Sequence, residues 1–594
     1  MTYQAPVRDY TFLLRDVLQL ERYASLPAFA DASMDTVEAI LEEAGKFTSE
    51  VLAPLNTVGD KQGCVWSPDH TVKTPDGFKD AYAKLVEGGW PALGSDPAYG
   101  GQGLPYVVNV AFSEMSSSAN MAFSMYPGLT HGCYSAIHVG GSQEQKDLYL
   151  PKLCSFQWAG TMNLTEPHCG TDLGLLRTKA VPQADGTYKI SGQKIWISGG
   201  EQDLTENIVH LVLARIEGAP QGTRGISLFI VPKFIPDDDG NPGVRNSVKC
   251  LGLEEKMGIH GNATCVISHE EATGWLIGEE NRGLALMFVM MNEARLGVGL
   301  QGIAQAEAAY QAAAAFAKDR LQGRSLTGPK NADGPADPII VHPDVRRMLM
   351  DARAIVEGGR AFMAWTALHG DLSHASPDEA VRQKGRDYMA LMTPVVKAFL
   401  TDRGFNVCSD AMQVHGGSGF TEHFPASQYL RDVRIALIYE GTNGVQALDL
   451  VGRKLAADGG RGVMSFFAEL DAFIEADTSA DMKPFVTGLA TAKAELQEAT
   501  MWLMQNGLAN PDNAGAASTD YLHLFGLTAL AYMWALQAKA ALARIAGGDT
   551  DSFYETKLTI GRYYIERVLP ETSSRLAKLK TGSDLLMKLP AVAF

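Results

Sequence analysis

The sequence is poor in cysteine, and its few cysteines form no metal-binding pattern. The 594 residues include 7 cysteines, which are scattered, odd in number and without a CxxC pair. Such usage is typical of a reducing compartment and argues against both a disulfide framework and a cysteine-rich metal centre. We therefore expect a cytoplasmic protein without a metal site.

Long hydrophobic runs and an excess of basic charge are also missing. The longest apolar run, residues 524–536, is shorter than the ~18 residues of a membrane-spanning helix and predicts a buried core helix. The first residues, MTYQAPVRDYTFLLRD, carry charges too early and too often for a signal peptide. The net charge of -17 argues against general affinity for nucleic acid or anionic membranes. We expect neither nucleic-acid binding nor membrane insertion.

The chain of 594 residues is too long for one hydrophobic core, so several domains are expected. Changes in the sequence pattern divide it into four. Residues 1–158 have a helical period, seen in MDTVEAILEEAGKF. Residues 159–280 contain short, β-branched, partly alternating runs, which predict a β domain of about seven strands. The helical period returns in residues 281–455, where SLTGPKNADGPADPIIVHP predicts an irregular surface loop. LAADGGRG is typical of a linker, and residues 461–594 are expected to form a helical extension with a break at NGLANPDNAGAAST. The expected fold class is mainly α with an inserted β domain.

One carboxylate stands in an unusual setting. In ALIYEGTNGV, residues 436–445, Glu440 follows apolar residues and precedes a Gly-Thr-Asn-Gly turn. A charged residue at such a place is seldom buried unless it is paired or takes part in chemistry. From this stretch alone two interpretations stay open: Glu440 is a catalytic base, or it caps a helix that begins at Thr442. The cap is the more common case.

Three further stretches suit a flat, polar ligand. MNLTEPHCGTDLG, at the entrance to the β domain, is either a loop whose backbone N–H groups face a ligand or a plain turn. In GQKIWISGG, Trp196 and Ser198 share one strand face, where the indole could stack on a ring, although a core tryptophan is the commoner case. The glycines of QVHGGSGF permit close approach to a pyrophosphate, but this pattern alone is weak.

Together, in this order and on this domain plan, the stretches resemble the motifs of the acyl-CoA dehydrogenase family of flavoproteins. TEPHCGTD is similar to the family's flavin loop TEPxxGSD, and KIWISGG to its strand KxWITNG. DRLQGR is similar to RxQFG, QVHGGSGF to QxxGGxGY, and RDVRIALIYEGTNGVQ to RDxxxxxIYEGTxxIQ. The resemblance covers about residues 35–455. It implies a helical N-terminal domain, a β-barrel-like middle domain and a helical-bundle domain, here followed by the extension.

The resemblance also implies roles for individual residues. It makes Glu440 the catalytic base and FAD the cofactor, bound between the β domain and the helical domain that follows it. Positions at the flavin ring are matched by Met162, Leu164, Thr165, Thr171, Trp196 and Ser198. Positions that reach the adenine-pyrophosphate half of FAD from a neighbouring subunit are matched by Arg320, Gln322, Gln413 and Gly417, and the turn that completes the site by Thr442 and Gly444. Substrate positions are matched by Thr171, Arg295, Tyr439 and Gly441.

The sequence departs from the family pattern in three places. Gly323 and Arg324 stand where Phe-Gly usually follows RxQ, and Gly444 stands where a glutamine is common. These departures concern the cross-subunit adenine contacts rather than the flavin or the base. The loop after Arg324 and the extension resemble those of larger family members, which implies a homodimer.

The reaction that the resemblance implies is α,β-dehydrogenation of an acyl thioester. Because the α-proton is weakly acidic, the base needs a raised pKa and the enolate oxygen needs stabilisation. In the family this oxygen is bonded by the flavin ribityl chain and by the backbone N–H of the base residue, beside the glycine that Gly441 matches. Some members carry the base on the helix of Arg295, where this chain has Ala294. The neighbouring Glu293 is turned ~100° around the helix and is expected to be a surface or structural carboxylate.

Among larger family members, the chain is most similar in length to bacterial enzymes that oxidise 3-methylmercaptopropionyl-CoA in dimethylsulfoniopropionate breakdown. That implies 3-(methylthio)propanoyl-CoA as substrate, 3-(methylthio)acryloyl-CoA as product and an electron-transfer flavoprotein as acceptor. A general short-, medium- or long-chain acyl-CoA dehydrogenase of β-oxidation is the alternative. Two methionine-rich segments either wall a short acyl pocket or belong to an ordinary core. Their candidate residues are Met121, Phe123, Met125, Tyr126, Met287, Phe288, Met290 and Met291.

Three other functions fit the sequence less well. An acyl-CoA oxidase would let oxygen reach the reduced flavin, but the forms IYEGT and TEPHCGTD are more similar to dehydrogenases. A DNA-associated relative would need a basic final domain, whereas residues 461–594 hold 12 Lys and Arg against 15 Asp and Glu. Membrane docking by the last domain would use the apolar run at residues 524–536, which a core helix explains better.

Overall fold

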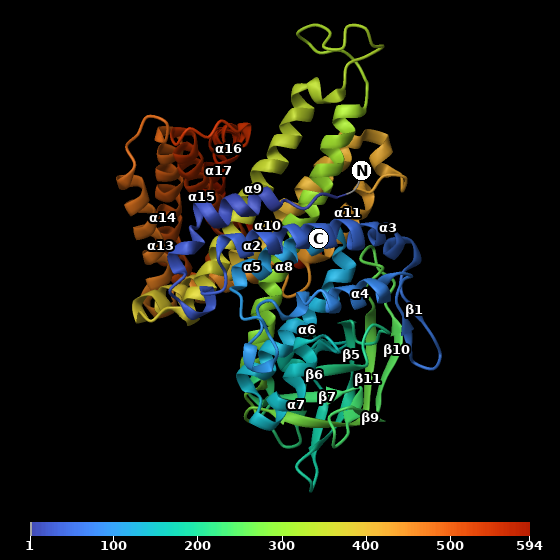
Figure 1. Cartoon of the computed structure of the whole chain (residues 1–594). Coiled ribbons are helices and arrows are strands. Elements are labelled where there is room, and N and C mark those ends of the chain that lie inside the picture. Colours follow the sequence, from blue (N-terminus) through green and yellow to red (C-terminus); the bar gives the residue numbers. More distant parts are fainter. Residues whose placement is uncertain (1–2) are drawn as a thin grey trace.

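Helices form the centre of the molecule in this computed structural model, which describes residues 3–594. The β-sheet lies at one end of the helical centre, and the C-terminal helices pack along one side of it (Figure 1). At the end opposite the sheet, the loop of residues 320–342 projects from the molecule (Figure 1). The order of elements along the chain is helical, then mostly β, then helical to the end.

The N-terminal part is helical as predicted, with one exception. Its helices are α1 (Val7–Phe12), α2 (Met34–Phe47), α3 (Ala53–Gln62), α4 (Phe78–Glu87), α5 (Tyr106–Ala119), α6 (Met121–Gly140) and α7 (Gln143–Cys154). Side chains cap several of them: Ser33 accepts from the Thr36 N–H before α2, and Ser142 and Gln145 form a capping box at α7. The exception is a hairpin of β1 (Val65–Trp66) and β2 (Val72–Lys73), whose strands are too short to show a period in the sequence.

Seven strands form the main sheet and confirm the β-barrel-like expectation. They are β3 (Trp158–Asn163), β4 (Lys179–Pro182), β5 (Tyr188–Ser198), β6 (Asn207–Ile216), β7 (Ile226–Pro232), β10 (Val248–Leu253) and β11 (Thr264–Ile277). The order is β10-β11-β5-β4-β6-β3, and β7 pairs with both β11 and β6. Because β7 joins these two strands, five strands close into a ring. A separate hairpin of β8 (Phe234–Pro236) and β9 (Pro242–Arg245) follows β7.

Two 37-residue helices form the middle of the helical centre. The helices after the sheet are α8 (Gly283–Asp319), α9 (Pro343–Ala375), α10 (Glu379–His415), α11 (Ala426–Val433) and α12 (Asn443–Asp449). Glycines let α8 and α10 approach closely, since a Cβ on Gly404 would lie 2.1 Å from the carbonyl oxygen of Gly302. By length and composition α8 passes the test for a membrane-crossing helix, the one described helix that does. It packs against α5, α6, α9 and α10.

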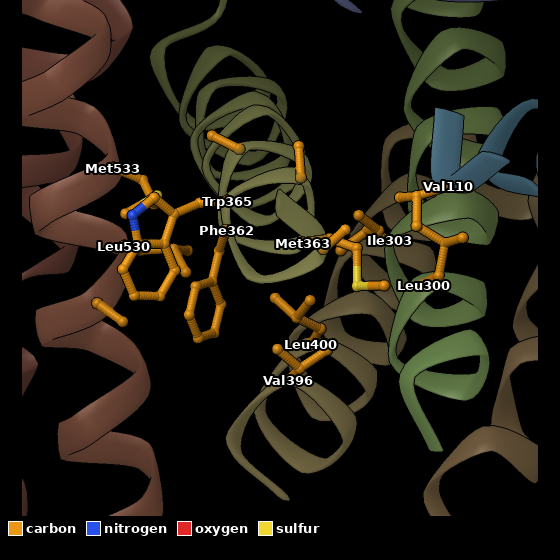
Figure 2. Close-up of a cluster of buried hydrophobic side chains, with 14 of the residues drawn as sticks. Val110, Leu300, Ile303, Phe362, Met363, Trp365, Val396, Leu400, Leu530 and Met533 are labelled. Atoms are coloured by element: carbon orange, nitrogen blue, oxygen red, sulfur yellow. The ribbon is translucent and has the colours of Figure 1, made fainter. Parts of the chain in front are cut away.

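The extension consists of α13 (Arg461–Ala476), α14 (Lys483–Ala509), α15 (Pro511–Ala546), α16 (Ser552–Tyr563), α17 (Glu571–Leu579) and α18 (Asp584–Lys588). In α15 every residue from 524 to 535 is buried, which confirms the predicted core helix. The predicted break in this region shrinks to Asn510, because Asn510 caps α15 and Pro511 occupies its first position. Figure 2 shows α15 packing into the shared core: Leu530 and Met533 face Trp365 of α9, and Met363 of the same helix lies toward Ile303 of α8.

Candidate functional site

Glu440 lies in a tight turn between two short helical segments. A 3₁₀ turn (Arg434–Leu437) ends just before it, and α12 begins at Asn443. The N-cap of α12 is Thr442, whose hydroxyl accepts from the Val445 N–H at 3.4 Å. Glu440 is therefore not the cap. Its backbone is left-handed, with φ of +56°, a conformation that costs free energy in a residue other than glycine and is concentrated at functional sites.

Hydrogen bonds hold the turn at the Glu440 carbonyl. Arg295 Nε donates to this oxygen at 3.3 Å and Gln446 Nε2 at 3.2 Å. Within residues 3–594 neither the Glu440 carboxylate nor its backbone N–H has a hydrogen-bond partner. Gly441 follows at φ of +85°, where a Cβ would lie 2.6 Å from the Gln446 side chain, so this position requires glycine. Gly444 has no such constraint, because nothing lies within 4 Å of its Cβ position.

The surroundings of this turn bring the pKa of the Glu440 carboxyl group close to neutral pH. Burial raises the pKa of Glu440 to about 7, while the positive charges of Arg295 and Lys397 pull it down. Arg295 was predicted from the resemblance. Lys397 was not, and the signal that could have revealed it is a single lysine inside the otherwise apolar TPVVKAFL segment.

Glu293 is not a surface carboxylate. It is half-buried on α8, beside Ser135 of α6, and burial raises its pKa also to about 7. Of the two expectations for Glu293, the structural one remains. A raised pKa therefore does not by itself distinguish Glu440 from Glu293, and their surroundings must do so. Two cations lower the pKa of Glu440 against the effect of burial. For Glu293, the Ser135 hydroxyl is the group that opposes the effect of burial.

The residues predicted for the flavin ring lie on β3, on the loop that follows it and on the bulged strand β5. The loop after β3 lies beside β5, because the Ile195 N–H donates to the Thr165 carbonyl at 3.0 Å. Trp196 is 60% exposed and has a left-handed φ of +59° where the pairing of β5 with β11 shifts. The regular alternation that predicted a face shared with Ser198 is interrupted there. The other candidates range from buried (Met162) through half-buried (Leu164, Thr165, Ser198) to exposed (Thr171).

A buried ion pair fixes the loop after β3. Lys194 Nζ lies 2.9 Å from Glu166 Oε1 and donates to the Leu164 carbonyl, also at 2.9 Å. The Glu166 carboxylate also accepts from the backbone N–H groups of Arg177 and Thr178. Glu166, His168 and Cys169 have the spacing of metal ligands, but these hydrogen bonds give Glu166 a structural role.

A second group of predicted residues lies far from the turn. Arg320, Gln322, Gln413 and Gly417 are all exposed and lie at the ends of α8 and α10 remote from the sheet. Tyr439 donates its hydroxyl to Gln301 of α8, so the turn sits beside Gln301, and Arg320 is about 28 Å further along the helix axis. The structure does not bring these residues to the turn within one chain.

The departures Gly323 and Arg324 have a structural explanation in the projecting loop. Gly323 has a φ of +72°. Arg324 donates to the carbonyl oxygens of Asn331 and Gly334 at 2.8 and 2.6 Å. Asp337, whose side chain is fully buried, accepts from three backbone N–H groups of the loop, and these hydrogen bonds lower its pKa to about 2.

Only part of the methionine-rich wall reaches the turn. Met121 and Met125 of α6 form a cluster with Ala122 and Ile259, against which Tyr439 packs. The other candidates lie elsewhere: Phe123 and Tyr126 belong to the main helical core, Met287, Met290 and Met291 pack under the sheet, and Phe288 lies against the Arg295 guanidinium.

Comparison with known proteins decides the family. Models of the acyl-CoA dehydrogenase N-terminal, middle and C-terminal domains match residues 34–157, 161–272 and 281–455. A model described as acetyl-CoA dehydrogenase C-terminal like matches residues 466–590. The chain is 43% identical over 590 residues to the 3-methylmercaptopropionyl-CoA dehydrogenase of Ruegeria pomeroyi, and the match covers 99% of both chains. The chain belongs to the acyl-CoA dehydrogenase family.

Other members of the acyl-CoA dehydrogenase family match along the whole chain. The broad-specificity linear acyl-CoA dehydrogenase FadE5 of Mycobacterium tuberculosis is 35% identical, with 100% of both chains covered. The structure of Caenorhabditis elegans ACDH-11 in complex with C11-CoA has a TM-score of 0.79 and 18% identity, and covers 99% of this chain and 96% of its own. This likeness shows that the fold is shared, extension included.

The protein is thus an FAD-dependent acyl-CoA dehydrogenase, with an acyl-CoA as substrate. The residues of the bulged strand fit FAD: a large indole stands exposed beside a half-buried loop held by the Lys194–Glu166 pair. An exposed tryptophan at a strained backbone position is expected where a flat ring covers it.

Proposed function

We propose that the protein dehydrogenates a short acyl-CoA, with Glu440 as the base that removes the α-proton and 3-(methylthio)propanoyl-CoA as the principal substrate. The observation that carries the proposal is the state of Glu440. Its carboxylate and N–H lack partners within the described residues, its carbonyl is anchored by Arg295, and its pKa is raised to about 7. A base that removes an α-proton needs these properties.

Glu440 has the acid–base strength and surroundings for this step. A carboxylate with a pKa near 7 is a stronger base than an ordinary one and is still largely ionised at slightly alkaline pH. The negative charge that develops on the thioester oxygen needs a donor, and the Glu440 N–H, beside Gly441, is available for it. When bound, FAD supplies the acceptor for the β-hydride. Thr171, Trp196 and the other ring residues named above would hold it there.

The walls near the turn favour a short acyl group. Met121, Met125 and Ile259 form a buried apolar cluster against Tyr439, and a packed interior of this kind leaves little room for a long chain. Thioether side chains are polarizable and suit a sulfur-containing chain. The Ruegeria relative is named for 3-methylmercaptopropionyl-CoA and the Mycobacterium relative for linear acyl-CoAs in general. A general acyl-CoA dehydrogenase of β-oxidation is therefore the alternative.

Arg320, Gln322, Gln413 and Gly417 are proposed to bind the adenine half of FAD in a neighbouring copy. Their exposure and their distance from the turn support this role, and a homodimer is the assembly we propose. Thr442 and Gly444 are proposed to complete the cofactor site. An electron-transfer flavoprotein is the proposed electron acceptor. The four family-model matches support the proposed domain bounds of 1–158, 159–280, 281–455 and 461–594.

The test is the kcat/KM of the purified enzyme for 3-methylthiopropionyl-, butyryl-, pentanoyl- and palmitoyl-CoA with an artificial electron acceptor. We expect the highest value for the sulfur-containing substrate and values within about tenfold for the two other short chains, because one methylene is worth only ~0.8 kcal/mol. A palmitoyl-CoA value at or above the short-chain values would refute the short pocket. Hydrogen peroxide formed on turnover without an acceptor would indicate an oxidase.

A further inference from the structure

Lys397 of α10 is buried in an unusual way. Its side chain is 0% exposed, yet no carboxylate of residues 3–594 forms an ion pair with it. The other deeply buried lysines behave differently: the ammonium groups of Lys194 and Lys557 each lie against a carboxylate. An ammonium buried without such a partner is costly. Lys397 therefore needs an explanation other than fold stability.

Asn443 holds the Lys397 ammonium in place. Its Oδ1 accepts from Lys397 Nζ at 2.8 Å, and its Nδ2 donates to Thr401 Oγ1 at 2.9 Å and to Asp402 Oδ1 at 2.7 Å. These partners fix the orientation of the amide. Asn443 is also the first residue of α12, three positions after Glu440. One side chain thus ties the turn that carries the base to the buried lysine.

The C-terminal extension completes this arrangement. His523 of α15 has its Nε2 2.9 Å from the second carboxylate oxygen of Asp402, and its ring lies edge-on to Phe399 of α10 at 5.6 Å. A continuous chain of contacts leads from His523 through Asp402 and Asn443 to Lys397. Lys397 and His523 are buried, and Asp402 and Asn443 are half-buried.

We propose that Lys397 is a positioning residue whose ammonium acts through space on the Glu440 carboxylate, and that Asn443, Asp402 and His523 hold it there. The inference rests on the proposed role of Glu440 as the base. Two cations face Glu440, Arg295 from α8 and Lys397 from α10, and the titratable group on its own segment is Tyr439. Arg295, whose Nε donates to the Glu440 carbonyl, is the larger of the two positive influences on the carboxylate. Lys397 is the second, and its ammonium is held by Asn443 of the segment that carries Glu440.

The physical effect is on the fraction of ionised base. Burial lowers the pKa of Lys397 to about 8, so the group is still cationic at pH 7. A cation close to a carboxylate stabilises its ionised form and lowers its pKa by roughly 1–3 units. Removal of the Lys397 charge should raise the pKa of Glu440. Because the base must be ionised, the rising limb of the kcat/KM profile should then move to higher pH.

The experiment is the pH profile of kcat/KM for the FAD-loaded enzyme with butyryl-CoA, pH 5.5 to 9, for the wild type, Lys397→Met, Lys397→Arg and Asn443→Ala. FAD content and Tm are measured on every variant. We expect the rising limb of Lys397→Met to move up by about one pH unit, with a tenfold loss at pH 6 that shrinks toward the alkaline plateau. Lys397→Arg should restore the wild-type limb, and Asn443→Ala should move it in the same direction by a smaller amount.

The outcomes separate the inference from the function on which it rests. A limb that stays in place in Lys397→Met, with only the plateau or the FAD content reduced, would mean a purely structural lysine and overturn the inference. If Lys397→Met does not fold, Asn443→Ala decides by the same criterion. Glu440→Gln is measured alongside: if it keeps activity, Glu440 is not the base, whereas an inactive Glu440→Gln with an unmoved limb in Lys397→Met refutes only the role of Lys397.

Discussion

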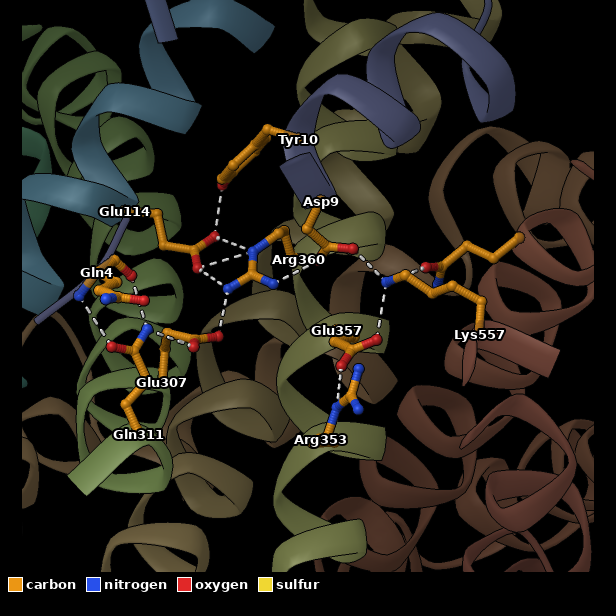
Figure 3. A network of polar contacts seen from close by, with 11 residues as sticks. Gln4, Asp9, Tyr10, Glu114, Glu307, Gln311, Arg353, Glu357, Arg360 and Lys557 are labelled. Atoms are coloured by element: carbon orange, nitrogen blue, oxygen red, sulfur yellow. Dashed lines mark hydrogen bonds and ion pairs between the residues drawn. The ribbon is translucent and has the colours of Figure 1, made fainter. Parts of the chain in front are cut away.

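Replacing Arg360 by leucine should destabilise the protein by about 3–5 kcal/mol, because it leaves buried carboxylates without their cation. Arg360 of α9 is 1% exposed and lies 2.6 Å from Glu114 of α5, 2.6 Å from Glu307 of α8 and 2.5 Å from Asp9 of α1. Asp9 also contacts Lys557 of α16 (Figure 3). The network therefore joins the N-terminal segment, the helical centre and the extension.

The loss should depend on pH in a defined direction. Burial already raises the pKa of Glu114, and Arg360 is the main influence that opposes it. Without Arg360 the folded-state pKa rises further, while the unfolded value stays near ~4.3. The folded variant then binds a proton that the unfolded chain has released, so its stability falls as pH rises between these two values. The deficit should be smaller at pH 5 than at pH 8.

The assay is urea denaturation followed by far-UV circular dichroism at pH 5 and pH 8, on wild type, Arg360→Leu and a surface control. Arg562→Leu is the control, since its ion pair with Glu566 is 59% and 54% exposed and should be worth less than about 1 kcal/mol. A deficit for Arg360→Leu as small as that of the control, or one larger at pH 5 than at pH 8, would refute this reasoning.

Three further predictions concern the site. Met125→Ala should raise kcat/KM for hexanoyl- and octanoyl-CoA relative to butyryl-CoA by about tenfold, because it opens space equal to two or three methylenes; an unchanged ratio would place Met125 outside the acyl pocket. Trp196→Ala should weaken FAD binding about tenfold or more through loss of ring stacking, measured by the ratio of flavin to protein absorbance after gel filtration; full retention would contradict the flavin position. Arg320→Ala should lower FAD affinity without changing the assembly seen by light scattering, and FAD held stoichiometrically by a wild-type monomer at sub-micromolar concentration would rule out the cross-subunit site.

Sequence patterns were enough for the order of helices and sheet, because burial of one face imposes a period on the residues. The β-branched runs NIVHLVLARI and GISLFIVP became β6 and β7, and the apolar run at residues 524–536 became the buried middle of α15. The hairpin β1–β2 was not predicted, because a strand of two residues is too short to show a period. The break near Asn510 was overestimated because a capping side chain and Pro511 start a new helix at once.

The sequence did not predict which residues lie next to individual charged side chains. The motif placed Glu440 but not Lys397, which reaches it from a helix some 40 positions away in the chain. Glu293 was expected on the surface or in a structural role, but Ser135, which lies beside it, comes from α6. The Arg360 network joins residues from five elements. Such long-range pairs leave no local pattern, because the periodicity of a helix reports which face is buried and not what lies against it.

The most direct test of the account compares Glu440→Gln with Glu293→Gln, two variants that each lose one carboxylate whose pKa burial raises to about 7. Both should be purified with FAD bound and mixed with 3-methylthiopropionyl-CoA, and both turnover and flavin bleaching should be recorded. We expect Glu440→Gln to bind FAD and thioester but to lose turnover by about 10³-fold or more, since general-base catalysis contributes 10²–10⁴-fold. Glu293→Gln should keep activity within a few-fold. An inactive Glu293→Gln beside a Glu440→Gln that retains more than a few per cent of turnover would contradict the account.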